Sequence, residues 1–382
     1  MFNTFFVFIK KDRITQYLLV LLVVFLIWWV FGYVVYKQEV TSVVSGAFLW
    51  GMTYQIFAFI GAIAGLFISW KWGGVHSVMG RAIGLFSLGL LFQNFGQTIF
   101  SLDNLSGEEI PYPSIADIGY FGSVLFYILG AIGLARASGI AVTLRSFKNA
   151  ILAIFVPVAV LGFSYYFFLR AYEFDWSAPL RIFLDFGYPF GEAIYISIAL
   201  LTYVLSRKIL GGIMKYKISF ILTALFIQYV AEYNFLYQAY NGTWDNSAYG
   251  DVLYLFAYVV MALGLLQLHP KYVSPRLRPE AQTIDATRIW QKRDEVATLI
   301  VKSQAVVIGS IAWSEAQQVQ GVAINTETEK VYLIEENSKD TLEKLVAQYE
   351  RLFGPASREV CRDAVRKISS QVMPEDLPQM LR

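Results

Sequence analysis

The sequence is poor in the residues that build disulfides and metal sites. Its 382 residues include one cysteine, Cys361, and two histidines, His76 and His269. A single cysteine permits no intramolecular disulfide, and so few ligands cannot assemble a Cys-rich or His-rich zinc site. We therefore expect neither a metal site nor a cofactor.

Charged residues are also scarce, and they are unevenly distributed. They make up 16% of the chain against 56% apolar residues, with a mean hydropathy of +0.50, whereas an average soluble protein is about a quarter charged. Residues 282–382 hold 28 of the 60 charged side chains, 13 basic and 15 acidic, without a basic stripe. The composition indicates a lipid-embedded body with a soluble tail, and it argues against a nucleic-acid partner.

Eight segments are apolar over the roughly 20 residues that a helix needs to cross a bilayer. They cover residues 15–36, 47–69, 79–100, 115–136, 148–169, 181–206, 217–240 and 249–268. We expect an α-helical polytopic membrane protein with a transmembrane domain over 1–268, a proline-containing linker over 269–283 and a small soluble α+β domain over 284–382.

The tail pattern predicts a helix, three strands and two further helices. The first helix covers 284–302, the strands cover 305–311, 321–325 and 330–335, and two amphipathic helices follow.

Basic residues between these segments predict the orientation, because Lys and Arg are retained on the cytoplasmic side. Fifteen lie on one side of the predicted membrane: Lys10, Lys11, Arg13, Lys71, Arg81, Arg136, Arg145, Lys148, Arg207, Lys208, Lys215, Lys217, Lys271, Arg276 and Arg278. The other side has only Lys37, Arg170 and Arg181. We therefore expect a multi-pass protein of the cell (plasma) membrane with both termini in the cytoplasm.

Short motifs recur at the starts of the even-numbered segments. Asp117-Ile-Gly-Tyr120, Asp185-Phe-Gly-Tyr188 and Asp251-Val-Leu-Tyr254 each open one, and Gly51-Met-Thr-Tyr54 opens the second. The tyrosines are 66, 68 and 66 residues apart. A weaker match joins Leu90-Leu-Phe-Gln93 to Leu225-Phe-Ile-Gln228. We expect four repeated helical hairpins in a pseudo-symmetric bundle.

Polar side chains at membrane depth are the candidate ligand-binding residues, since ionisable groups inside a membrane mark functional sites by default. They are Gln93, Gln97, Asp117, Asp185, Glu192, Gln228, Glu232 and Asp251. Gln93 and Gln97, like Gln228 and Glu232, are four residues apart and share a helix face. We expect a polar cleft that opens outward, with Glu232 as its principal residue.

A structural role stays open for part of this set. Acids in a first helical turn are favoured by the helix dipole, and Ser114-Ile-Ala-Asp117 fits a capping box, so Asp117 and Asp251 can act as caps. For the repeated tyrosines, contact with a ligand is one interpretation, and a role as interfacial anchors or packing residues is the favoured one. These are Tyr54, Tyr120, Tyr188 and Tyr254.

One stretch resembles the multi-helix membrane input regions of prokaryotic signalling proteins. It runs Pro111-Tyr-Pro-Ser-Ile-Ala-Asp117-Ile-Gly-Tyr120 and continues into an apolar segment ending Gly133-Leu-Ala-Arg136; the resemblance covers roughly residues 80–270. Such regions usually precede diguanylate cyclase or histidine kinase modules. Here no GGDEF or GGEEF signature and no phosphoacceptor histidine box follows. The resemblance implies a sensor whose output passes through the small tail by binding.

Two functions follow as hypotheses. The first is a membrane sensor that relays an outer-side or intramembrane signal to a cytosolic interaction domain, which binds a cytosolic protein or self-associates through 284–382. The second is a secondary transporter or ion or proton pathway that uses Asp185, Glu192 and Glu232. Parallel repeats favour the first, since coupled transporters more often use inverted ones. We expect no enzymatic activity, because GxSxG, HExxH, P-loop and Rossmann motifs are missing.

Overall fold

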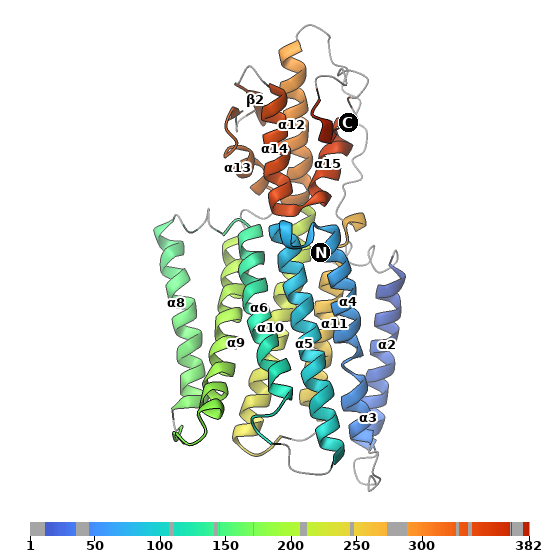
Figure 1. Ribbon diagram of the computed structural model, residues 1–382, viewed down its shortest axis with the longest axis vertical. Coiled ribbons are helices and arrows are strands. Elements are labelled where there is room, and N and C mark those ends of the chain that lie inside the picture. The colour runs from blue at the N-terminus through green and yellow to red at the C-terminus, as the bar shows by residue number, and fades with distance from the viewer. Residues whose placement is uncertain are drawn as a thin grey trace.

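Eight helices in the described part of the chain are long and apolar enough to cross a membrane, which agrees with the predicted spans. The computed structural model (Figure 1) describes residues 12–35, 46–106, 111–140, 144, 146–170, 172–206, 212–244, 248–272, 289–325, 328–334, 338–366, 368 and 377–381. Most of the predicted linker lies outside these residues, as do Lys10, Lys11, Lys37, Arg145, Arg207, Lys208, Arg276 and Arg278. The domain boundaries therefore stay predictions.

The long helices run side by side beneath a smaller C-terminal domain (Figure 1). They are α2 (Arg13–Trp29) with its π-helical extension η1 (Val30–Val35), α3 (Gly46–Thr53), α4 (Ile56–Lys71), α5 (Val78–Ser106), α6 (Ala116–Ala137), α8 (Phe147–Ser164) with η3 (Tyr165–Leu169), α9 (Pro179–Ser206), α10 (Gly212–Tyr240) and α11 (Tyr249–Gln267). Short 3-10 helices η2 (Gly74–His76) and η4 (Pro270–Tyr272) follow α4 and α11.

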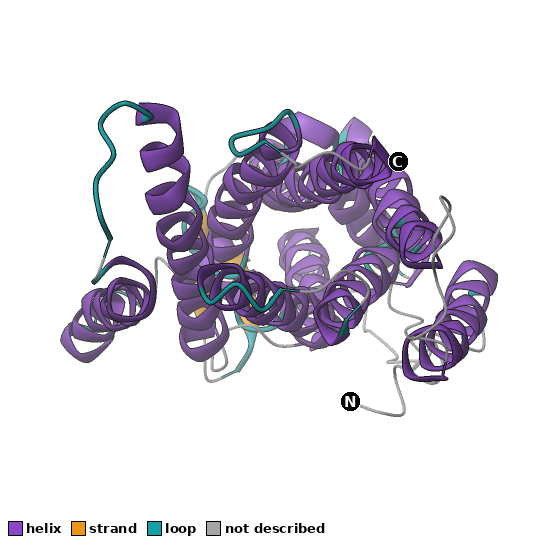
Figure 2. Ribbon diagram, turned by 90° about the horizontal axis from the view of Figure 1, so that it is seen from below, coloured by secondary structure: helices purple, strands orange, loops and turns teal. Residues whose placement is uncertain are grey.

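Six of the described helices form a closed ring, which Figure 2 shows end on. α4, α5, α6, α9, α10 and α11 each pack against the next, and α11 returns to α4. Two helices lie outside the ring: α8 packs on α9, and α2 packs on α11. The ring therefore places residues far apart in the sequence around a common interior.

The ring has two halves of corresponding construction. In each half the first helix (α2 or α8) lies outside and the next three lie inside. Matching residues are 134 or 135 positions apart, as are Tyr120 and Tyr254, or Phe100 and Phe235. Both phenylalanines contact one ring, Trp244, with centroids 5.6 and 5.7 Å away. Four equivalent hairpins would place α2 and α5 alike, so the described helices favour two units of four helices, and the hairpin repeat stays a prediction.

The outer faces of the helices are apolar. On α8, Ile154, Phe155 and Val158 are 69%, 65% and 62% exposed, although all three are large hydrophobic side chains. A helix that exposes such residues in most directions is suited to lipid rather than to water, where this surface would favour aggregation.

A polar cluster joins the start of α2 to the segment after α11. Lys271 Nζ lies 3.2 Å from Asp12 Oδ1, and the Tyr272 hydroxyl donates to the same oxygen at 2.7 Å. Burial opposes ionisation of Asp12, but hydrogen bonds from Tyr272, Thr15 and Lys271 hold its pKa below the usual range. The first and last spanning helices are thereby tied together at one end of the ring.

The C-terminal domain surrounds one long helix. It contains α12 (Ile289–Ile308), α13 (Ile311–Ala316), β1 (Val322–Asn325), β2 (Lys330–Leu333), α14 (Ser338–Phe353), α15 (Pro355–Arg366) and η6 (Gln379–Leu381). β1 and β2 pair antiparallel, with Val322 opposite Leu333. The strands predicted over 321–325 and 330–335 and the two amphipathic helices are confirmed.

The strand predicted over 305–311 is wrong. α12 continues through this segment to Ile308 and ends at Gly309, whose φ is 69°. Val307 and Ile308 are 3% and 1% exposed and extend the buried face that begins at Ile300. The β-branched residues of this segment favour a strand locally. The segment is helical because its apolar residues are buried at helical spacing together with those earlier in α12.

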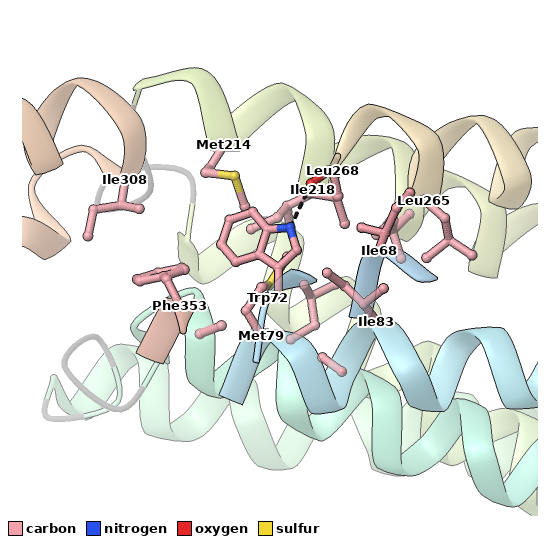
Figure 3. Packing of buried hydrophobic residues seen from close by; sticks show 14 of the residues in the cluster. Ile68, Trp72, Met79, Ile83, Met214, Ile218, Leu265, Leu268, Ile308 and Phe353 are labelled. Carbon is pink, nitrogen blue, oxygen red and sulfur yellow. Dashed lines mark hydrogen bonds between the residues drawn. The ribbon is translucent and has the colours of Figure 1, made fainter. Parts of the chain in front are cut away.

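The C-terminal domain contacts the end of the ring directly. α12 packs against α10, and α14 packs against α5. Trp72, which follows α4, is 1% exposed, and its ring contacts Phe353 of α14 with centroids 6.1 Å apart. Trp72 Nε1 donates to the carbonyl of Leu268 at 2.7 Å (Figure 3). One indole thus joins α4, α11 and the C-terminal domain.

Candidate ligand cavity

A cavity of about 800 Å³ lies within the ring. Its lining includes part of α3, which lies at the end of the helices farthest from the C-terminal domain (Figure 1). Its walls come from α3, α5, α6, α9, α10, α11 and the loops at that end. Six acids and one base are among its described lining residues: Asp117, Glu173, Asp185, Glu192, Glu232, Asp251 and Arg181. The interior is therefore strongly acidic.

The structure brings the predicted site residues together. Seven of the eight line this cavity: Gln93, Gln97, Asp117, Asp185, Glu192, Glu232 and Asp251. The eighth, Gln228, lies behind the wall and donates its amide to Glu232 Oε1 at 2.7 Å. Their role in ligand binding stays a prediction, but their convergence is a property of the fold.

Glu232 is held by three donors from three helices. Gln93 Nε2 of α5 and Gln228 Nε2 of α10 donate to Oε1 at 3.0 and 2.7 Å, and the Tyr254 hydroxyl of α11 donates to Oε2 at 2.8 Å. Gln97 occupies the corresponding position 135 residues earlier, and Tyr120 donates to its Oε1 at the same 2.8 Å. The same tyrosine hydrogen bond thus occurs in both halves. Its acceptor is the neutral Gln97 in the first half and the acidic Glu232 in the second.

Asp117 both stabilises the start of α6 and faces the cavity. Its Oδ2 accepts the backbone N–H of Ser114 at 2.7 Å, which is one half of the predicted capping box. The other half differs, because Ser114 Oγ accepts the N–H of Ala116 at 3.1 Å rather than that of Asp117. Its other oxygen, Oδ1, accepts the Tyr188 hydroxyl of α9 at 2.8 Å. Structural and cavity roles coexist in this residue.

Asp185 is surrounded by donors near the mouth. The hydroxyls of Tyr112 and Tyr172 donate to its two oxygens at 2.7 Å each, and Arg181 Nε lies 3.8 Å from Oδ2. Partial desolvation and the neighbouring Asp185 carboxylate raise the pKa of Tyr172 to about 12, so its phenol remains a donor at neutral pH.

Glu192 differs from the other acids. Its side chain is 0% exposed to bulk solvent and lines the cavity, yet neither carboxylate oxygen has a hydrogen-bond partner. One turn further along α9, the hydroxyl of Tyr195 is also buried without a partner. The position 134 residues before Glu192 is Ala58. Burial of a carboxyl group without a hydrogen-bond partner is costly, and an ionisable side chain at membrane depth is a candidate functional residue.

The repeated tyrosines lie where the less favoured sequence interpretation, contact with a ligand, would place them. Tyr54, Tyr120, Tyr188 and Tyr254 all line the cavity, and the last three donate to Gln97, Asp117 and Glu232. They therefore face the cavity, while an anchoring role in a headgroup layer stays a prediction. The repeat of Asp and Tyr three residues apart was the available signal, because such a pair shares one helix face.

No protein-family model, no curated protein and no solved structure matches this chain. Functional inference consequently depends on the cavity and on its connection to the C-terminal domain.

Proposed function

We propose that this protein is a multi-pass sensor of the plasma membrane, with both termini in the cytoplasm. The cavity takes a small ligand from the outer side, and the C-terminal domain passes its occupancy to a cytosolic protein or to a second copy of the chain. The observation that carries this proposal is the position of the cavity and of the docked domain at opposite ends of the same helices.

The end of the ring beneath the C-terminal domain is filled with side chains. Trp72, Met79, Ile218 and Leu268 are each at most 1% exposed and pack together (Figure 3). Lys217 Nζ donates to the backbone carbonyl of Gln267 at the same end. This packing supports a cavity with one entrance.

The docking contacts offer a direct route between ligand and output. Helices α10 and α11 carry Glu232 and Tyr254 in the cavity wall, and α10 packs against α12 at its other end. A change in the packing of these helices would therefore move α12. A sensor needs such an element, with two arrangements whose populations the ligand changes.

A cation or proton pathway is the second candidate, and the unpaired Glu192 is the observation in its favour. Transport requires the site to become accessible from both sides. The packed layer around Trp72 and the C-terminal domain above it oppose an exit there, so sensing fits the structure better. We also propose a binding role for the cavity rather than catalysis.

The test fills the cavity mouth covalently and follows the C-terminal domain. Ala239 is exposed on α10 and lines the cavity. An Ala239→Cys variant, reacted with a bulky maleimide in nanodiscs, should change amide hydrogen exchange in α14 and α15 relative to the unlabelled protein. Burial raises the pKa of Cys361 to about 12, so the native thiol should not react and the full chain serves as background.

The matched control is Asn241→Cys, at an exposed position that follows α10 and is outside the cavity lining. Its label should leave the exchange of α14 and α15 unchanged. Equal hydrogen exchange of α14 and α15 in the two labelled variants would contradict coupling between the cavity and the C-terminal domain. It would favour the cation or proton pathway.

A further inference from the structure

We propose that the cavity ligand is a linear organic polycation, an aliphatic diamine or polyamine, bound at two levels of acids. This inference deepens the proposed function by naming the ligand class. Six acidic side chains line the cavity, and its one described basic group, Arg181, already lies 3.8 Å from Asp185. The acidic walls would repel an anionic ligand.

Glu192 supplies the inner contact. It is fully buried, faces the cavity and has no partner on either carboxylate oxygen. An ammonium group placed beside it would supply both the missing hydrogen-bond donors and the missing positive charge. Glu232 and Asp117 accept bonds from neutral tyrosine, amide or backbone donors, which orient them without supplying a positive charge.

The acids lie at two depths, which selects an elongated ligand. Asp185 and Glu192 are seven residues apart on α9, or about 10 Å along the helix axis. Glu232 belongs to the inner level with Glu192, while Asp117 and Asp251 lie in first helical turns at the outer level. A single ammonium group can reach one level only, whereas an extended triamine spans both.

Tyrosine rings separate the two levels. Tyr188 and Tyr254 line the cavity and use their hydroxyls for Asp117 and Glu232, so the contact they offer a ligand comes from their rings. Aromatic faces attract ammonium groups and pack against methylene chains. This wall suits alternating amine and methylene groups better than an inorganic ion.

A divalent metal ion fits less well. In the described part of the chain, no three Asp, Glu, His or Cys residues lie close enough together to hold a metal ion. The acids are spread around a volume of about 800 Å³, far larger than one ion needs. Their separation matches several spaced charges rather than one concentrated charge.

The charge is also concentrated in one half of the ring. Glu192 and Glu232 correspond to Ala58 and Gln97 in the other half. An inner ammonium group is therefore drawn to α9 and α10, and α10 packs against α12. Ligand binding in this geometry acts on a helix that contacts the C-terminal domain.

The test measures binding of spermidine, a linear triamine, to the full chain in nanodiscs by calorimetry, with butylamine and Mg²⁺ as comparison probes. Spermidine should bind more tightly than either. Glu192→Gln should weaken spermidine and butylamine by about 10- to 100-fold. Asp251→Asn should weaken spermidine while leaving butylamine unchanged, because only the longer ligand reaches the outer level.

Asp175→Asn is the matched control, since Asp175 is exposed at the same end of the protein and lies outside the cavity lining. This variant should bind spermidine as the native chain does. Thermal unfolding of each variant establishes that it is folded. Absence of spermidine binding to the native chain, native-like binding to Glu192→Gln, or equal or tighter binding of butylamine or Mg²⁺ would overturn the inference.

This outcome is separable from that of the proposed function. The labelling experiment with Ala239→Cys uses no amine, so a response of α14 and α15 without spermidine binding refutes the ligand class alone. Spermidine binding without any response to the label refutes the sensor alone.

Discussion

Glu192 and Glu232 are the same side chain in one cavity, but their surroundings predict opposite effects on stability. Glu232 accepts three hydrogen bonds, and Glu192 accepts none. Replacing Glu192 with Met, which has a similar shape and no polar oxygens, should stabilise the ligand-free protein by about 1–3 kcal/mol, because a buried carboxyl group without hydrogen-bond partners is removed. Glu232→Met should destabilise it by a similar amount, because three donors lose their acceptor. Thermal unfolding in one detergent compares them.

The comparison has a clear contrary outcome. If Glu192→Met lowers the unfolding temperature as much as Glu232→Met does, then Glu192 is partnered in the native protein and its assignment as an unpaired binding group is wrong. If Glu192→Met instead gains stability and loses amine binding, then Glu192 reduces the stability of the native fold in return for ligand binding, as binding-site residues often do.

The individual site residues could be predicted because acids and amides are conspicuous in apolar helices. Hydropathy and helical spacing identified Glu232, Gln228 and Gln93 and indicated that their faces converge. The unpaired state of Glu192 could not be predicted, because it depends on which helices surround α9. Tyrosines at helix starts have two ordinary uses, anchoring and hydrogen bonding, and only the arrangement of the ring distinguishes them.

The turn between α14 and α15 makes a close contact with the turn after α4. Gly354 has a φ of 64°, and a Cβ at this position would overlap the carbonyl oxygen of Trp72. Gly354→Ala should therefore displace the C-terminal domain from the ring and increase hydrogen exchange in α14 and α15. Gly242 has a φ of 63° with nothing within 4 Å of an added Cβ, so Gly242→Ala carries the same backbone strain without the overlap.

Equal exchange in these two alanine variants would contradict the docked position of the domain. If Gly354→Ala alone releases α14 and α15, the variant also separates ligand binding from output, since the cavity lies at the other end of the ring. Amine affinity should then remain native.

Element type was predictable where periodicity was long and unpredictable where it was short. All eight spans have enough apolar length to leave little ambiguity. The run of Ala305, Val306, Val307 and Ile308 is four residues long and compatible with either a strand or a buried helix. Reading it together with Val296, Ile300 and Gln304 at helical spacing would have assigned it correctly to α12.

The whole molecule has a direction that the sequence indicated only through charge. Loop composition predicted cytoplasmic termini, and the structure ties the beginning of α2 and the end of α11 to one end of the ring. The spans of α2 and α8 have the highest mean hydropathy, 2.4 and 2.1 against 1.2–1.8 for the ring helices, which fits their position outside the ring. The closure of the six others was not predictable, because hydropathy does not specify which helices pack together. Contacts between distant segments decide which helices enclose the cavity.

The direction of sensing can be tested with cysteine accessibility in intact cells. Asn241 lies at the cavity end, and Glu343 is exposed on α14. A membrane-impermeant maleimide should label Asn241→Cys in intact cells and Glu343→Cys only after permeabilisation, while native Cys361 stays unlabelled because it is buried. The reverse pattern would place the acidic cavity in the cytoplasm and the C-terminal domain outside. The protein would then respond to a cytoplasmic cation, and loop charge would have failed as a guide to its orientation.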